Sequence, residues 1–131
     1  MARFTDIQND VIRKYRIVID EHSACWGRMH AHVRERRVCK WHPKNSVQAT
    51  FDLLHEVGHV VNNKSTMRRC EEEYHATVWA LERAREYGLE IPDKIIADYQ
   101  RYINMELDRG KRRHGEGYAE KYLITNKIRI A

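Results

Sequence analysis

The sequence predicts one mainly helical α+β domain over residues 1–131, with about four helices and a small antiparallel β-sheet. Apolar residues recur every three or four positions along most of the chain, which is the spacing of an amphipathic helix. Only residues 24–42 carry the alternating pattern that is typical of strands. The length of 131 residues suits one domain with a modest core, and no repeat or linker divides it.

The N-terminal part of the chain contains the first helix and the sheet. Apolar residues at helical spacing from Ile7 to Val18 extend the expected first helix to about residue 22. Apolar residues in 24–42 then alternate with basic residues on either side of a short charged run. This pattern predicts an antiparallel hairpin.

The two middle helices begin at residues whose side-chain oxygens cap helices. Ser46 or Thr50 opens the second helix, which ends near residues 62–64. Ser65 or Thr66 opens the third. The second helix is apolar on most of its circumference, so we expect it to be buried with the sheet packed on it.

Glycine and proline mark the remaining helix boundaries. Gly88 is expected to end the third helix, and Pro92 to start the fourth in its first turn. Gly110 is expected to end the fourth helix. The following KRRHGEG reads as a loop, and the terminal KIRIA as a short edge strand.

Composition excludes several classes of protein. Lysine and arginine outnumber aspartate and glutamate by 24 to 19, but the basic clusters are short and lack interleaved aromatic residues, so nucleic-acid binding is not expected. No apolar run reaches the length of a membrane span and the N-terminus lacks the layout of a signal peptide, so we expect a cytoplasmic protein with no membrane partner. The 3 cysteines form no CxxC pair that would indicate a structural zinc site.

The most informative stretch is DLLHEVGHVV, residues 52–61. On a helix, His55 and His59 lie one turn apart on the same face, so both imidazoles can be directed at one metal ion. Glu56 is rotated about 100° around the helix, toward a water beside that metal. Metal-dependent hydrolases need two such ligands and a carboxylate that accepts the proton of the water.

A catalytic zinc site takes a third protein ligand and leaves one position open for water. Three glutamates occur together in the third helix. At 100° per residue, Glu73 lies at the centre of the apolar face, Glu72 at its margin and Glu71 on the solvated side. We therefore expect Glu73 to be the third ligand, with Glu72 as second choice. The alternative is that Glu73 pairs with Arg68 or Arg69.

Small residues indicate how the two helices meet. Gly58 inside the second helix costs about 1 kcal/mol relative to alanine, so we expect another segment to approach it closely. Ala76, Ala80 and Ala84 share the apolar face of the third helix and allow such an approach. Trp79 lies on the polar side of that helix, so it is expected to pack against another element such as the N-terminal helix.

HEVGH (55–59), followed by EYHATVWA (73–80), resembles the ImmA/IrrE group of small zinc metallopeptidases. The resemblance covers about residues 46–84 and implies a zincin-like fold. Thr77 stands where that group has asparagine, and Trp79 stands where it has phenylalanine. Proteins of this kind are common in phages and mobile elements.

The resemblance also implies a set of roles. His55, His59 and Glu73 match the ligands of one zinc ion per chain, and Glu56 matches the catalytic acid/base. The implied reaction is hydrolysis of peptide bonds in an intracellular protein, such as a repressor or another regulatory protein. Glu56 would take the proton of a metal-activated water as it attacks the peptide carbonyl, and would deliver it to the leaving amine.

Two other functions are carried as alternatives. One is a zinc-binding but catalytically silent interaction or regulatory module; Glu56 argues against it, because a purely structural site has no use for an acid/base. The other is a basic nucleic-acid-associated regulator, which salt-dependent DNA binding would reveal. His114 and Tyr118 are candidate donors to an oxyanion. An ordinary surface loop is the alternative at those two positions.

Overall fold

The computed structural model describes residues 3–20, 30–32, 36–39, 44–62, 68–115 and 130. Within them, four helices and three short strands follow in the order α1 (Arg3–Lys14), β1 (Val18–Asp20), β2 (His30–His32), β3 (Arg37–Cys39), α2 (Val47–Val61), α3 (Arg69–Glu86) and α4 (Asp93–His114). This confirms the predicted mainly helical α+β fold with four helices and a small sheet.

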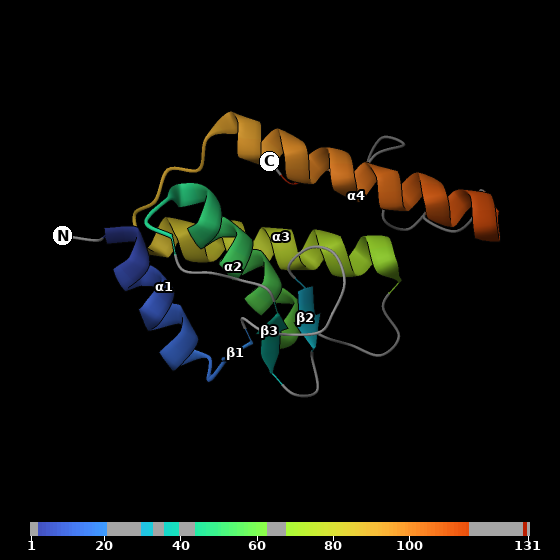
Figure 1. The fold of residues 1–131 in the computed structure, drawn as a ribbon. Coiled ribbons are helices and arrows are strands. Elements are labelled where there is room, and N and C mark those ends of the chain that lie inside the picture. Colours follow the sequence, from blue (N-terminus) through green and yellow to red (C-terminus); the bar gives the residue numbers. More distant parts are fainter. Residues whose placement is uncertain are drawn as a thin grey trace.

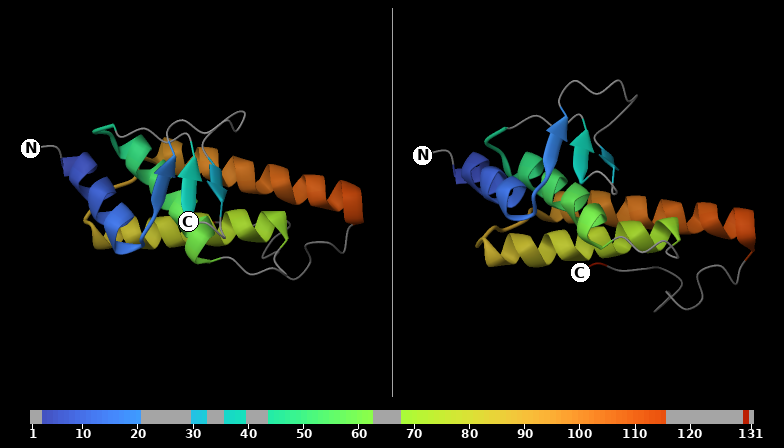
Figure 2. Two further views of the ribbon diagram at one scale, coloured as in Figure 1. Left: turned by 60° about the horizontal axis from the view of Figure 1, so that its bottom comes forward. Right: turned by 90° about the horizontal axis from the view of Figure 1, so that it is seen from below.

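Helix α2 lies at the centre of the arrangement (Figure 1). The sheet, through β2 and β3, and helix α1 pack on it from one side, and α3 packs on it from another. Helix α4 runs antiparallel along α3, as both views in Figure 2 show. None of the helices in the described ranges is both long and apolar enough to cross a membrane. The central place of α2 explains why the sequence makes it apolar on most of its circumference.

The sheet has the strand order β1-β3-β2. Strands β2 and β3 are antiparallel, with Ala31 opposite Val38, so the expected hairpin is confirmed. Strand β1 pairs with β3 in parallel, with Ile19 opposite Val38. The prediction of a purely antiparallel sheet is therefore wrong for one of its two pairs. The prediction is wrong because the first helix was expected to include residues 18–20, which instead form β1.

The first helix ends at Lys14 and not near residue 22. Arg16 adopts a left-handed conformation with φ of 54°. The amide of Ile17 donates a hydrogen bond to the carbonyl of Ile12 at 2.9 Å, and the amide of Arg16 donates one to the carbonyl of Arg13 at 3.3 Å. These two bonds form a Schellman motif, which reverses the chain and releases the next residues to pair as a strand.

Of the two residues predicted to open helix α2, Ser46 is the one that caps it. The Ser46 hydroxyl accepts a hydrogen bond from the Ala49 amide at 3.2 Å, so Ser46 is the N-cap. Thr50 lies inside the helix, where its hydroxyl donates to the carbonyl of Ser46 at 2.8 Å. Asn62 ends the helix. The N-cap of α3 is Arg68, so the prediction that Ser65 or Thr66 opens this helix is wrong. Both of those residues lie outside the described residues.

Glycines end α3 and α4, but only one of them is the predicted glycine. Gly88, with φ of 69°, follows α3 as expected. Gly110 does not end α4; it is buried inside the helix, which continues to His114 and stops at Gly115, with φ of 88°. Residues 111–114 are thus helical and not a loop. The expected C-terminal edge strand lies outside the described residues, apart from Ile130.

The main core lies between α1, α2, α3 and the sheet. Its fully buried large side chains include Phe51, Leu53 and Leu54 from α2 and Val38 from β3. Trp79 packs at the edge of this core, with its ring 5.1 Å from that of Tyr15 in an edge-to-face arrangement. Because Tyr15 directly follows α1, the expected packing of Trp79 against the N-terminal region is confirmed.

Candidate metal site

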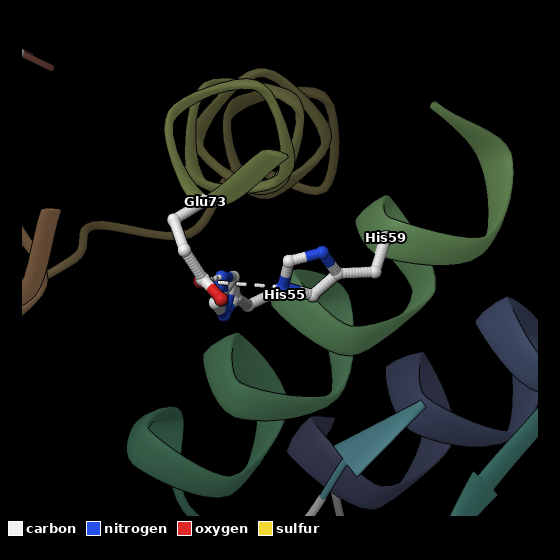
Figure 3. A group of neighbouring side chains, drawn as sticks. All are labelled: His55, His59 and Glu73. Atoms are coloured by element: carbon white, nitrogen blue, oxygen red, sulfur yellow. Dashed lines mark hydrogen bonds and ion pairs between the residues drawn. The ribbon is translucent and has the colours of Figure 1, made fainter. Parts of the chain in front are cut away.

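Two histidines from α2 and one glutamate from α3 converge between these helices (Figure 3). The Nε2 atoms of His55 and His59 lie 3.0 and 3.2 Å from the same oxygen, Oε2 of Glu73. One ligand atom from each residue lies within 4.8 Å of the others. In the described part of the chain, this is the one group of three or more metal-ligating side chains that could hold an ion.

The helical repeat of α2 explains why both imidazoles point to one place. His55 and His59 are four residues apart, and their ring centroids are 4.7 Å apart. Leu54, directly before His55, and Val57, between the two histidines, are fully buried in the core. Packing of these neighbours fixes the rotation of α2, and that rotation turns the two histidines toward α3.

Helix α3 comes close enough to contribute a carboxylate because small residues meet at the crossing. A Cβ atom built on Gly58 would lie 2.7 Å from the carbonyl oxygen of Ala76. Ala76, Ala80 and Ala84 are all buried on this face of α3. The expected close approach at Gly58 is thus confirmed, with α3 as the approaching segment.

Glu73 is only 2% exposed and uses its two oxygens differently. Oxygen Oε2 faces the two histidines, whereas Oε1 lies 3.0 Å from the guanidinium of Arg69. Glu73 therefore makes both contacts that the sequence suggested: it faces the two histidines, and it forms an ion pair with Arg69. Glu72, the second choice as ligand, does not belong to the cluster; it forms an ion pair with Arg69 at 3.9 Å.

His55 is held neutral. Burial, followed by the charge of His59, lowers the pKa of His55 to about 3. Its Nε2 atom is buried and makes no hydrogen bond with any described residue, although it is 3.0 Å from Glu73. A buried nitrogen without a hydrogen bond is uncommon in folded proteins and calls for an explanation.

His59 and Glu73 shift the pKa of each other in opposite directions. Burial disfavours the charged form of His59, but the hydrogen bond and the charge of Glu73 outweigh burial and raise its pKa. For Glu73, burial acts to raise the pKa, and the bond from His59 with the neighbouring positive charges overcomes it and lowers the pKa. The two shifts have one cause, because each group stabilises the charged form of the other.

The donor set fits a divalent transition metal. Two imidazole nitrogens and one carboxylate oxygen are the ligands that zinc takes in catalytic sites. Ligands about 2.1 Å from one ion lie within about 4 Å of one another. The separations of 3.0 and 3.2 Å between the two histidine nitrogens and Glu73 Oε2 meet this condition. An ion would also be a partner for the Nε2 atom of His55, which has no hydrogen bond with the residues that the structure describes.

Glu56, the predicted acid/base, is half-buried on α2 beside this cluster. Its negative charge is one of the influences that raise the pKa of His59, which shows that the carboxylate lies near the site. His114, a candidate donor, is exposed in the last turn of α4. Tyr118 lies outside the described residues.

Helix α4 contributes Tyr99 to the surroundings of the candidate metal site, and the sequence did not predict this contact. The ring of Tyr99 meets His55 edge-on with centroids 4.7 Å apart, and its hydroxyl donates to Asp52 Oδ1 at 2.6 Å. Burial, followed by the charge of Asp52, raises the pKa of Tyr99, so this hydroxyl keeps its proton. The spacing of apolar residues in this part of the sequence is compatible with Tyr99 on an inner face, but it gives no indication of which helix the ring meets.

Comparison of the chain with models of known protein families, with curated proteins and with solved structures finds no match.

Proposed function

We propose that the protein is a zinc-dependent metallopeptidase in which His55, His59 and Glu73 hold one zinc ion. The observation that carries the proposal is the buried Nε2 atom of His55, which has no hydrogen bond with any described residue and points with His59 at one carboxylate oxygen. Burying three such groups costs several kcal/mol unless each finds a partner. A metal ion gives one partner to all three.

Glu56 is the proposed general base. When bound, the metal supplies a Lewis acid that activates water at neutral pH and polarises a peptide carbonyl. The carboxylate of Glu56 accepts the proton of the attacking water and then delivers it to the nitrogen of the leaving amine. Glu56 follows His55 directly on α2, so the same helix positions the base and the first ligand.

The proposed substrate is a peptide bond of a protein in the cytoplasm. The resemblance of the HEVGH and EYHATVWA segments to the ImmA/IrrE group supports a repressor or another regulatory protein as the substrate class. The same resemblance supports the zincin-like description of the fold and a phage or mobile-element setting.

A silent zinc-binding module is the competing function. A structural zinc site is closed by four protein ligands, whereas a catalytic site has three and keeps one position for water. The cluster in the described part of the chain contains three candidate ligands. That number, together with the half-buried Glu56, favours catalysis.

The first test is the metal content of the purified protein, of His59→Ala and of Glu56→Gln. His75→Ala is the matched control, because His75 is an exposed histidine on α3 outside the cluster. We expect about one zinc per chain in the wild type, the control and Glu56→Gln, and a loss in His59→Ala. A folded wild type that takes up no added zinc would overturn the proposal.

The second test separates catalysis from silent binding. Zinc-loaded protein is incubated with a mixture of fluorescence-quenched peptides of varied sequence, and the Glu56→Gln variant is run beside it. Cleavage by the wild type that is lost in Glu56→Gln, with zinc retained, supports the peptidase. Zinc binding with equal signals from both proteins assigns the silent module instead.

A further inference from the structure

Arg69 connects the candidate metal site to α4. One guanidinium nitrogen, Nη2, lies 3.0 Å from Glu73 Oε1 and donates to the hydroxyl of Tyr102 at 3.4 Å. The other, Nη1, lies 3.9 Å from Glu72. The guanidinium therefore lies between the third candidate ligand on α3 and a tyrosine on α4.

Because of this contact, the two carboxylate oxygens of Glu73 have different partners. Oε1 is engaged by a permanent positive charge, while Oε2 is left for the two histidines. Glu73 is buried and Arg69 reaches it from the solvent side, with 58% of its own side chain exposed. An arginine guanidinium is planar and keeps its charge at any pH at which the protein is folded, so it can hold one oxygen in a fixed direction.

Helix stability does not account for an arginine at this position. Arg69 is the first residue of α3, where the helix dipole disfavours positive charge. The acidic residues of this turn, Glu71 and Glu72, are the ones that the dipole favours. The ion pair with Glu73 and the bond to Tyr102 are thus the interactions that justify a cation at the start of this helix.

We propose that Arg69 is a positioning residue that restricts Glu73 to one oxygen as a metal ligand. A carboxylate that binds through both oxygens occupies two positions on a metal, whereas one that binds through a single oxygen leaves room for water. By occupying Oε1, Arg69 keeps the coordination number low and preserves the open position. This inference rests on the metal site of the proposed function.

The test replaces Arg69 with methionine, which has a similar reach but neither charge nor N–H groups. Arg85→Met is the matched control, because Arg85 is an exposed arginine near the other end of the same helix. The probe is Co²⁺ added to the metal-free protein. Its visible absorption is strong in four-coordinate sites and weak at higher coordination numbers, and its affinity is measured by competition with a chelator.

In Arg69→Met we expect weaker visible absorption per bound cobalt, because Glu73 is free to bind through both oxygens. We also expect cobalt affinity equal to the wild type or higher by roughly threefold, because a nearby positive charge that opposes the ion is gone and is partly screened by solvent. Arg69→Lys keeps the charge without the planar fork, so its spectrum should lie between the two. Arg85→Met should match the wild type.

Three results would overturn the role of Arg69. An unchanged spectrum in Arg69→Met with cobalt bound means that Glu73 does not depend on the guanidinium. Weaker binding with a lower melting temperature and an unchanged spectrum means that Arg69 only stabilises the fold. A wild type that binds no cobalt removes the metal site itself, which distinguishes failure of the proposed function from failure of this inference.

Tyr102→Phe gives an independent check if Arg69→Met does not fold. This variant removes the hydroxyl that accepts the bond from Arg69 and leaves every charge in place. We expect a smaller decrease of the cobalt absorption in the same direction. A spectrum identical to the wild type would show that the guanidinium needs no support from α4, and would overturn that part of the inference.

Discussion

Gly58 of α2 lies directly against the backbone of Ala76 of α3. A Cβ atom on Gly58 would be 2.7 Å from the carbonyl oxygen of Ala76 and 3.0 Å from its Cα atom. The histidines and the glutamate of the candidate metal site stand on these same two helices, so the contact sets the distance across which they meet.

Gly58→Ala is therefore expected to weaken the site and the fold together. Forcing a methyl group into a packed contact costs about 1–3 kcal/mol, and the better helix propensity of alanine offsets about 1 kcal/mol of that. Separation of the helices should also lower zinc affinity. Thermal unfolding and a zinc competition titration measure the two effects.

The second substitution Ala76→Gly should not rescue Gly58→Ala. The atoms that the new methyl group meets belong to the backbone of Ala76, which glycine retains. Recovery of stability or zinc affinity in the double variant would contradict this expectation. It would show that the added methyl group meets the side chain of Ala76 and not its backbone.

Glu73→Gln tests the choice of the third ligand. An amide oxygen binds zinc far more weakly than a carboxylate, so we expect a loss of zinc affinity beyond the 10–100-fold that is typical of residues behind the ligands. Glu72→Gln is the matched control, because Glu72 is the neighbouring residue and lies outside the cluster. A larger loss in the control would transfer the ligand role to Glu72.

Zinc uptake should depend on pH through His59 alone. Glu73 raises the pKa of His59, so below that pKa the metal must displace a proton from His59, whereas His55, with a pKa of about 3, is already neutral. Affinity should therefore fall as pH falls through the raised pKa of His59 and level off above it. Calorimetry in buffers of different ionisation enthalpy should detect about one proton released per zinc bound at pH values below the raised pKa of His59; release of two protons would contradict the lowered pKa of His55.

Tyr99→Phe should lower stability without lowering zinc content. The variant loses the bond to Asp52, at 2.6 Å, which is worth about 1–2 kcal/mol, but it keeps the ring that packs on His55. Tyr99→Ala removes the ring as well, so we expect it to reduce zinc affinity. Urea unfolding and metal analysis of both variants separate the hydroxyl from the ring, and zinc loss in Tyr99→Phe would give the hydroxyl a role at the metal.

The candidate site was predictable because it depends on two local helical repeats. A spacing of four residues places His55 and His59 on one face, and a rotation of 100° per residue selects Glu73 from its acidic neighbours. Gly58 and the alanines of α3 added the information that these faces meet closely. None of these inferences needs contacts between segments that are distant in sequence.

The errors fall where such local signals are absent. Arg16 ends α1 in a left-handed conformation that the sequence usually marks with glycine, so the helix was predicted too long. The parallel pairing of β1 with β3 joins two separate strands, and no local motif in the sequence indicates that they meet. At the end of α4, Gly110 was expected to stop the helix, but it is buried inside the helix, which ends at Gly115. Burial of Gly110 depends on packing, which the local sequence does not reveal.

The three candidate ligands all lie between residues 55 and 73, on helices that follow one another in the chain. The entropic cost of closing a loop rises with its length, so joining these residues through an ion is inexpensive even in a chain that is otherwise unfolded. A zinc ion would then act during folding as well as in the native state, because it can join α2 to α3 before α1, α4 and the strands have assembled around them.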